Sequence, residues 1–329
     1  MKTMRILPGA VLLALSLGAA LPLSAAAEPV ESEVEAAVGN GPLRGTLTMP
    51  ADGAPRAAVV VVPGSGPTDR DGNSPLGVDA SYLKMLADAL AAQGVAAIRI
   101  DKRGLFGSKG TFLDANAVTF DHYGGDALAW VEVARRKTGL PCAWLVGHSE
   151  GGLVALIAAQ KAGPSLCGLV LLAAPGRPMG VVLREQLRAN PANAPVLDDA
   201  LAAIERLERG ELVDVTDFHP ALEAMFAPAV QGFLIDAFSR DPAALIATVA
   251  LPVLIVQGEA DLQVGVADAE ALAQALPAAE KVVLPGMNHV LKEVPADDMA
   301  ANLAAYRDPS LPLAPGLADA VVEFVARGR

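Results

Sequence analysis

A serine near the middle of the chain has neighbours that suit a nucleophile. Residues 147–151 read GHSEG, a G-x-S-x-G pattern that follows an apolar run at residues 143–146 and leads into a helical stretch at residues 151–161. Small glycines on both sides permit the sharp strand-to-helix turn that pushes a serine outward. The turn also brings the hydroxyl near the positive end of a helix, which favours a developing negative charge. The pattern predicts Ser149 as a nucleophile, and the alternative is a structural turn.

A serine hydroxyl needs a neighbouring base to attack at neutral pH, and the chain has only 4 histidines. His289 follows an apolar run at residues 281–284, so it reaches the same sheet edge as Ser149. It also comes after the serine, as the chain order serine, acid, histidine requires. Of the other three, His148 lies beside the serine but is expected to point away from it. His122 lies at the start of a helical stretch, and His219 precedes a proline. Position therefore selects His289 as the base.

Three acidic residues follow the apolar run at residues 253–256: Glu259, Asp261 and Asp268. Asp268 already lies in the next helical stretch, and Glu259 is closer to the strand, where a surface or supporting role suits it. Asp261 follows a glycine by three residues, so its loop can turn back toward the histidine. We expect Asp261 to hold the imidazole in one tautomer and to stabilise the imidazolium without taking the proton.

Acyl transfer also needs N–H donors for the negative oxygen of the tetrahedral intermediate. One expected donor is the backbone N–H of Glu150, the residue after the nucleophile. The other is expected from residues 63–67, PGSGP, which follow an apolar run at residues 57–62. Glycines there let the backbone approach a carbonyl oxygen, and the N–H of Ser65 is the predicted donor. The alternative is a plain Gly/Pro turn.

Two charged stretches remain. Residues 68–73 (TDRDGN) continue the expected oxyanion loop, and residues 101–104 (DKRG) follow another apolar run. Their charges suit local ion pairs that support the loop, or contact with substrate. Structural support is the favoured interpretation.

The elements that must position these residues follow from the periodicity. Residues 28–39 and 43–49 resemble an antiparallel hairpin around Asn40-Gly41-Pro42. Short apolar runs then alternate with helical stretches, which predicts an α/β fold with a parallel sheet buried on both faces. The predicted strands are 57–62, 95–100, 143–146, 169–173, 253–256 and 281–284, and the predicted helices are 78–93, 121–137, 151–161, 266–276 and 317–326.

Residues 176–249 interrupt this alternation with helical stretches only, at 179–189, 196–209, 221–238 (broken at Pro228) and 242–248. An all-helical insertion after a strand, over the sheet edge that carries the site, is expected to be a cap. The prediction is therefore a core at residues 28–175 and 250–329 with a helical cap at residues 176–249.

The N-terminus resembles a secretory leader. Residues 1–27 carry Lys2 and Arg5, then an apolar run broken by Pro8 and Pro22, then LPLSAAA. The run is short for a membrane span, so cleavage after Ala27 is favoured over a retained anchor, with no stable span afterwards. This predicts a periplasmic or secreted protein. Loss of two positive charges takes the net charge from −12 to −14, which argues against nucleic acid as a partner.

The chain has 2 cysteines, Cys142 and Cys167, too few for a disulfide scaffold. Each precedes an apolar run, so they are placed to bridge at one sheet end, or to be two buried thiols. No Cys/His spacing indicates a metal site.

The motifs GHSEGG (147–152), PGSGPTDRDGN (63–73), DKRG (101–104) and GMNH (286–289) resemble the α/β-hydrolase superfamily over nearly the whole chain after the leader. They are similar to bacterial esterases related to dienelactone hydrolases and to the serine aminopeptidase S33 group. The resemblance implies a mostly parallel eight-stranded sheet with helices on both faces, a catalytic triad, a helical cap inserted after the sixth strand and no cofactor. One departure is Pro63, where many members have histidine.

These observations predict a serine hydrolase that acts on a small-molecule carboxylic ester with a small to medium acyl group through an acyl-enzyme. A serine aminopeptidase or a thioesterase is the alternative, and an aminopeptidase would need anionic residues such as those of the insertion (Glu205, Glu208, Glu211 and Glu223). A serine nucleophile speaks against the dehalogenases, which use aspartate. A non-catalytic binding protein on the same scaffold is the remaining hypothesis.

Overall fold

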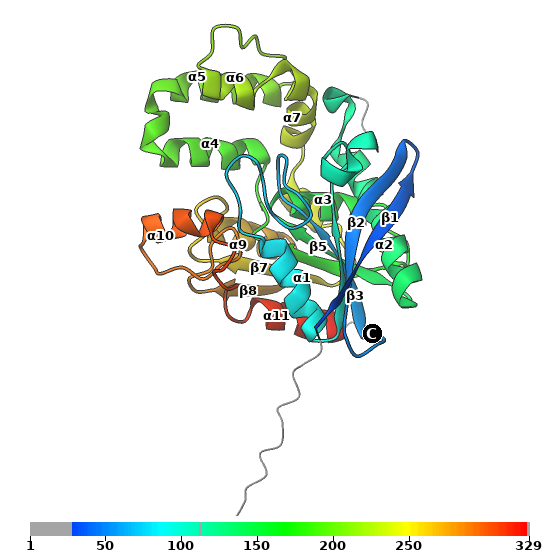
Figure 1. The fold of residues 1–329 in the computed structure, drawn as a ribbon. Coiled ribbons are helices and arrows are strands. Elements are labelled where there is room, and N and C mark those ends of the chain that lie inside the picture. The colour runs from blue at the N-terminus through cyan, green and yellow to red at the C-terminus, as the bar shows by residue number, and fades with distance from the viewer. Residues whose placement is uncertain (1–27, 112–113, 328–329) are drawn as a thin grey trace, which may run out of the picture.

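The computed structural model describes residues 28–111 and 114–327, and Figure 1 shows their fold. An eight-stranded sheet runs through it in the order β1-β2-β4-β3-β5-β6-β7-β8. The first two strands pair antiparallel, and β2 pairs antiparallel with β4; all the other neighbours are parallel. The predicted mostly parallel eight-stranded sheet is confirmed. The strands are β1 Val30–Val38, β2 Gly41–Met49, β3 Ala57–Val62, β4 Val95–Ile100, β5 Ala143–His148, β6 Leu166–Leu172, β7 Val253–Gly258 and β8 Glu280–Leu284.

Helices cover both faces of the sheet. On one face the apolar sides of α1 (Tyr82–Ala92) and α11 (Leu317–Arg327) pack on the strands. On the other face lie α2 (Phe120–Thr138), α3 (Glu150–Ala159) and α9 (Val266–Ala275). The central strands β3, β4, β5 and β7 are buried along their whole length, which explains why apolar residues predominate in them without alternation.

Two boundaries differ from the predicted ones for local reasons. Helix α1 begins at Tyr82 rather than at residue 78, because Val78 forms a bridge with Ser74 and Ser81 has a left-handed φ of 48°. The hairpin turns at Gly39 and Asn40, so that Gly41 already pairs with Val38. A short helix before α11, α10 (Met299–Ala304), was not predicted.

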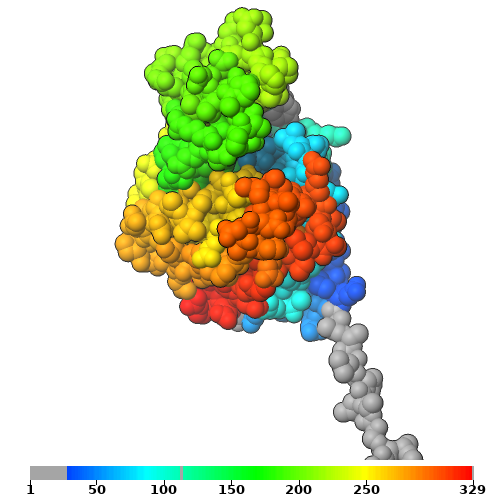
Figure 2. Space-filling view, turned by 90° about the vertical axis from the view of Figure 1, so that its left-hand side faces the viewer, coloured from blue at the N-terminus to red at the C-terminus, as the bar shows by residue number. Residues whose placement is uncertain are grey.

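The chain between β6 and β7 is helical, and Figure 1 shows these helices stacked beyond one edge of the sheet. In Figure 2 residues 179–238 form the green and yellow-green lobe on top of the molecule. Some apolar side chains of this insertion are buried, and they belong to the same apolar cluster as one face of the sheet (Leu187, Ile204, Leu207 and Phe226). Residues Pro220–Phe238 are long and apolar enough to cross a membrane by length and composition, but a break at Ala227 divides them. The helices are α4 Met179–Ala189, α5 Leu197–Glu208, α6 Pro220–Met225, α7 Gln231–Phe238 and α8 Pro242–Ile246, with short 3-10 turns at Pro191–Val196 and Pro228–Val230.

A disulfide joins the two cysteines at the end of the sheet opposite Ser149. Cys142 directly precedes β5 and Cys167 lies near the start of β6, with their Cα atoms 5.3 Å apart. The two strands are neighbours, so the sequence placed both cysteines at one sheet end. Of the two alternatives left open by the sequence, the bridge is the one that forms in the structure. The predicted leader, residues 1–27, lies outside the described residues.

Replacing both cysteines by serine should lower the free energy of unfolding by about 3 kcal/mol, since the bridge closes a loop with a sequence separation of 25 residues. Urea unfolding of the variant and of the wild type, with and without a reductant, measures this. The reductant should destabilise the wild type alone. Equal stability of the oxidised wild type and the variant would contradict the prediction.

Candidate active site

The turn from β5 into α3 holds Ser149 in a strained backbone conformation. Its φ is 53° and its ψ is −124°, an arrangement that residues with a side chain rarely adopt. A Cβ at Gly147 would collide with the carbonyl of Gly151, and one at Gly151 would collide with the carbonyl of Val62. The two glycines of the pattern are therefore required by close packing of strand, helix and neighbouring strand. The turn leaves Ser149 at the carboxyl edge of the sheet, 9% exposed.

The structure brings His289 and Asp261 together. The loop after β7 supplies Asp261 and the loop after β8 supplies His289, whose Nδ1–H donates to Oδ2 of Asp261 at 2.8 Å. Backbone N–H groups of Gln263 and Val264 donate to the other carboxylate oxygen at 2.8 and 2.9 Å. Burial opposes ionisation of Asp261, but His289 and these hydrogen bonds hold its pKa below the usual value. The imidazole thus presents Nε2 as a free acceptor.

The other acidic candidates lie elsewhere. Asp268 is fully buried on α9, where it accepts from the side chain and backbone of Arg177. Glu259 is exposed and lines a hollow of about 510 Å³ behind the Asp261 loop, whose lining includes neither Ser149 nor His289. Both candidates are therefore separated from the imidazole. The two distant histidines have local roles, since His122 completes the capping box of α2 and His219 caps α6.

His148 packs against His289 and forms hydrogen bonds with His289 and Tyr82. Its Nε2–H donates to the backbone carbonyl of His289 at 2.8 Å, and its Nδ1 accepts from the hydroxyl of Tyr82 at 3.2 Å. The rings of His148 and His289 lie 4.9 Å apart. Full burial, together with the neighbouring His289, lowers the pKa of His148 from 6.5 to about 3. It is therefore a neutral group in one fixed tautomer.

Two backbone N–H groups flank the serine without partners. Within residues 28–111 and 114–327, neither the amide of Ser65 nor that of Glu150 donates a hydrogen bond to the chain. The loop after β3 runs beside the turn because Val62 pairs with Gly147, and a Cβ built on Gly64 would lie 3.2 Å from the Cβ of Ser149. These are the two predicted donors, and both lie next to the serine. Ser149 and His289 share no hydrogen bond within the described chain, as is common before substrate binds.

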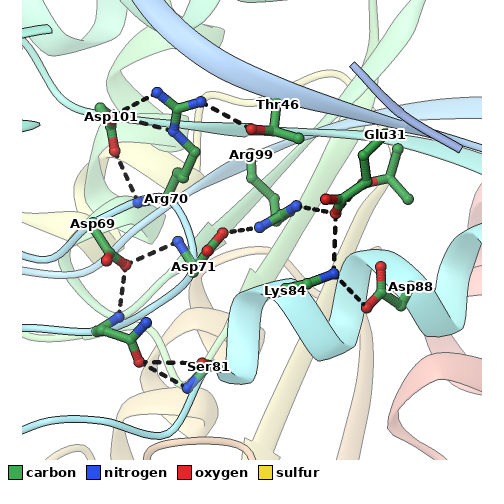
Figure 3. Close-up of polar contacts among 12 residues, drawn as sticks. Glu31, Thr46, Asp69, Arg70, Asp71, Ser81, Lys84, Asp88, Arg99 and Asp101 are labelled. Carbon is green, nitrogen blue, oxygen red and sulfur yellow. Dashed lines mark hydrogen bonds and ion pairs between the residues drawn. The ribbon is translucent and has the colours of Figure 1, made fainter. Parts of the chain in front are cut away.

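Charged residues fix the loop that carries Ser65, and Figure 3 shows their contacts. Arg70 forms two side-chain bonds to Asp101, at 3.1 and 2.7 Å, and its backbone N–H donates to the same carboxylate at 3.0 Å. Arg99, nearly fully buried, pairs with Asp71 and Glu31. Both charged stretches of the sequence thus act as structural support, the favoured interpretation.

A cleft of about 360 Å³ lies beside the loop of Ser65. Gly66 and Pro67 form one wall, and Val230 and Phe233 from the insertion form another. Tyr123 of α2 packs edge-on to Phe233 at 5.8 Å and shares the wall, and burial raises the pKa of its hydroxyl. Glu150 and Lys102 lie at its inner end. The cleft is mostly apolar, and Glu150 at its inner end is the residue that follows Ser149 in the chain.

The fold and the motifs define a family. The sequence pattern of the alpha/beta hydrolase family matches residues 59–306, more than half of the chain. The chain therefore belongs to this family.

Particular relatives can be named. The chain is 29% identical over 255 residues to the esterase EstD of Thermotoga maritima, covering 76% of this chain and 58% of that protein. Est1E from Butyrivibrio proteoclasticus superposes with a TM-score of 0.56 and 19% identity, covering 90% of this chain and 99% of that one. The proline iminopeptidase of Mycobacterium smegmatis has a TM-score of 0.53 and 17% identity, covering 79% and 92%. One fold thus carries differently named activities.

Sequence reasoning missed several residues of the site. Tyr82 lies on a predicted helix that carries no site motif, and its hydroxyl contacts His148. Lys102 lies in the stretch that was expected to support the loop after β3, but its hydrogen bond to Gly64 was not predicted. Nothing in the sequence distinguishes Phe233 from the other apolar residues of the insertion, yet it lines the cleft. The motif DKRG was the one available signal for Lys102. Its contact with the loop after β3 depends on the tertiary structure.

His148 makes stability depend on pH. In the unfolded chain His148 becomes protonated below about pH 6.5, whereas in the folded chain it becomes protonated only near pH 3. The wild type should therefore lose free energy of unfolding relative to His148→Gln by up to ~1.4 kcal/mol per pH unit as the pH falls through this window. Urea unfolding from pH 7.5 to 4.5 checks this, with the exposed His122→Gln as control. Parallel curves for wild type and His148→Gln would refute it.

Proposed function

We propose that this protein is a serine esterase in which Ser149 is the nucleophile, His289 the base and Asp261 the acid that orients the base. The observation that carries the proposal is the hydrogen bond between His289 and Asp261 beside a strained serine turn. Two unpartnered amides next to the serine support the same assignment. The esterase EstD lends further support, although this chain spans 58% of its length.

The geometry suits a two-step acyl transfer. The hydroxyl oxygen of Ser149 attacks the ester carbonyl carbon while Nε2 of His289 accepts the proton, and the amides of Ser65 and Glu150 bind the oxyanion. His289 then gives that proton to the alcohol oxygen as the C–O bond breaks. Water attacks the acyl-enzyme, again losing a proton to His289, and the serine leaves with this proton. These steps need no cofactor and no metal.

The cleft favours an uncharged acyl group of small to medium size over a peptide amino terminus. Most of its lining is apolar, its charged residues Lys102 and Arg103 are paired with carboxylates, and the insertion glutamates that an aminopeptidase would need do not line it. Three of them pair with arginines at 2.6–3.0 Å, Glu208 with Arg184 and both Glu205 and Glu211 with Arg209. The fourth, Glu223, is exposed. A thioester shares the same acyl chemistry and is the second candidate substrate.

We also propose that the protein is exported and acts in the periplasm or outside the cell. The leader pattern of residues 1–27 supports export. The bridge between Cys142 and Cys167 supports it independently, because disulfides persist in oxidising compartments.

The central test is the hydrolysis of p-nitrophenyl esters by wild type, Ser149→Ala and Asp261→Asn. Ser149→Ala should lower kcat by roughly 10⁴-fold or more, because the nucleophile is lost. Asp261→Asn should lower it by roughly 10⁴-fold while keeping the fold, because the imidazole loses the partner of its correct tautomer.

Ser310→Ala, which replaces a serine far from the site in the sequence, is the matched control. In addition, a serine-reactive phosphonate should label the wild type but not Ser149→Ala. Full activity in Ser149→Ala would sink the proposal. Turnover confined to aminoacyl-anilides would move the protein to the peptidases.

Phe233 should set the accepted chain length. Phe233→Ala enlarges the cleft, so the ratio of kcat/KM for octanoate over acetate esters should rise about tenfold. Phe238→Ala is the control, since Phe238 lies on the same helix α7 and is buried without lining the cleft. An unchanged ratio in Phe233→Ala would show that the acyl group binds elsewhere.

A further inference from the structure

A buried ion pair lies directly behind the two unpartnered amides. The ammonium of Lys102 donates to a carboxylate oxygen of Glu150 at 3.2 Å and to the backbone carbonyl of Gly64 at 2.6 Å. The two side chains are only 4% and 3% exposed. Taking both charges out of water is costly, so a pair at this place needs a reason beyond stability. Its contacts suggest one.

The bond to Gly64 fixes the direction of one oxyanion donor. In a trans peptide the carbonyl and the following N–H point in opposite directions, and the described chain contains no cis bond. Lys102 holds the carbonyl of Gly64, so the N–H of Ser65 in the same peptide must face away from Lys102. The hydroxyl of Thr68 holds the next carbonyl, that of Ser65, at 2.8 Å. The donor peptide is thus anchored on both sides.

The bond to Glu150 reaches the other donor. Glu150 carries the second unpartnered N–H and is the first residue of α3. Its carboxylate reaches back to the same ammonium that holds Gly64. One lysine therefore connects the loop after β3 with the start of α3, the two segments that supply the oxyanion donors.

Without this bond, the glycine peptide would be free to turn. Gly64 and Gly66 flank Ser65, and glycine tolerates either orientation of a peptide plane. Lys102 lines the inner end of the cleft, but Glu150 neutralises its charge and its hydrogen bonds go to Gly64 and Glu150, which favours a positioning role over substrate binding. The ammonium also lies 5.7 Å from the centroid of the Tyr123 ring.

We propose that Lys102 is a positioning residue that preorganises the oxyanion hole by fixing the Gly64–Ser65 peptide and joining it, through Glu150, to the start of α3. The inference rests on the proposed serine esterase and adds what holds its oxyanion donors in place. Lys102 itself touches no reacting atom. Its effect should therefore appear where negative charge develops on the substrate oxygen, and be nearly absent from binding of the uncharged substrate.

The test compares two inhibitors with one carbon skeleton. The hydroxyl oxygen of Ser149 adds to the carbonyl carbon of a trifluoromethyl ketone, and the resulting oxyanion lies in the oxyanion hole. The corresponding secondary alcohol binds without forming an oxyanion. Lys102→Met should lower kcat about 10²-fold with KM little changed, and should raise the Ki of the ketone by a similar factor. The Ki of the alcohol should change less than threefold.

Two further variants keep the test decisive. Lys102→Arg retains the buried charge but its wider head cannot occupy the same point, so a selective loss of about tenfold is expected even if Lys102→Met fails to fold. Arg177→Met is the matched control, because it removes a half-buried pair with Asp268 that has no contact with the Ser65 loop. It should lower stability while leaving kcat and both Ki values unchanged.

The outcomes separate the possible roles. Equal weakening of ketone and alcohol would show that Lys102 contacts the substrate, and would overturn the inference. If Lys102→Arg loses stability while kcat and the ratio of the two Ki values stay unchanged, Lys102 has only a structural role and the inference is wrong. Full activity of Ser149→Ala would overturn the proposed function itself, and the inference with it.

Discussion

Backbone crowding where β5 passes into α3 is the constraint on which the rest of the site depends. The strand, the helix and the neighbouring strand β3 approach so closely at this point that Gly147 and Gly151 can carry no side chain. This packing forces Ser149 into a positive φ and leaves its hydroxyl at the sheet edge. The strain is compensated by the burial of β3 and β5, whose residues are buried along their full length.

Parallel topology then brings the other groups to the same edge. The loop after β3 lies beside the serine on one side, and the loops after β7 and β8 bring Asp261 and His289 on the other. The buried side chains of Asp261 and His148, near the serine, both have hydrogen-bond partners. The carboxylate of Asp261 accepts four hydrogen bonds, and His148 avoids the cost of a buried charge by remaining neutral. The site is therefore rigid before substrate arrives, which suits stabilisation of a developing charge.

Much of this arrangement could be predicted from the sequence, because it is encoded locally. A glycine pattern around a serine, a histidine after the last strand and an aspartate after the preceding one were enough to place Ser149, His289 and Asp261 at one edge. The parallel sheet followed from uninterrupted apolar runs, which only strands buried on both faces can accommodate.

What escaped prediction depends on contacts between distant segments. Tyr82 reaches His148 across 66 positions of the chain, and Lys102 reaches Gly64 across 38. The start of α1 was missed because a left-handed residue, Ser81, delays the helix, and residue types alone do not reveal it. The sequence did not decide whether the two cysteines form a disulfide. Their strands were expected to be neighbours, but the exact register that brings the two residues together was not predictable. The sequence could not show which apolar residues of the insertion are buried in the interior and which line the cleft. Helical periodicity identifies an apolar face but not what that face packs against.

Several ion pairs of the insertion between β6 and β7 form within it, while Arg177 and Arg240 connect it to the core through Asp268 and Asp121. Arg184 pairs with Glu208 and Arg209 with Glu205, all within the insertion, while Val230 and Phe233 face the cleft. A segment organised in this way behaves as an exchangeable module. Recombination or gradual substitution can remodel what enters the cleft while leaving the reacting groups on the sheet untouched. The molecule thereby separates the evolution of selectivity from the conservation of its chemistry, and one scaffold can be diverted to new molecules at little risk to turnover.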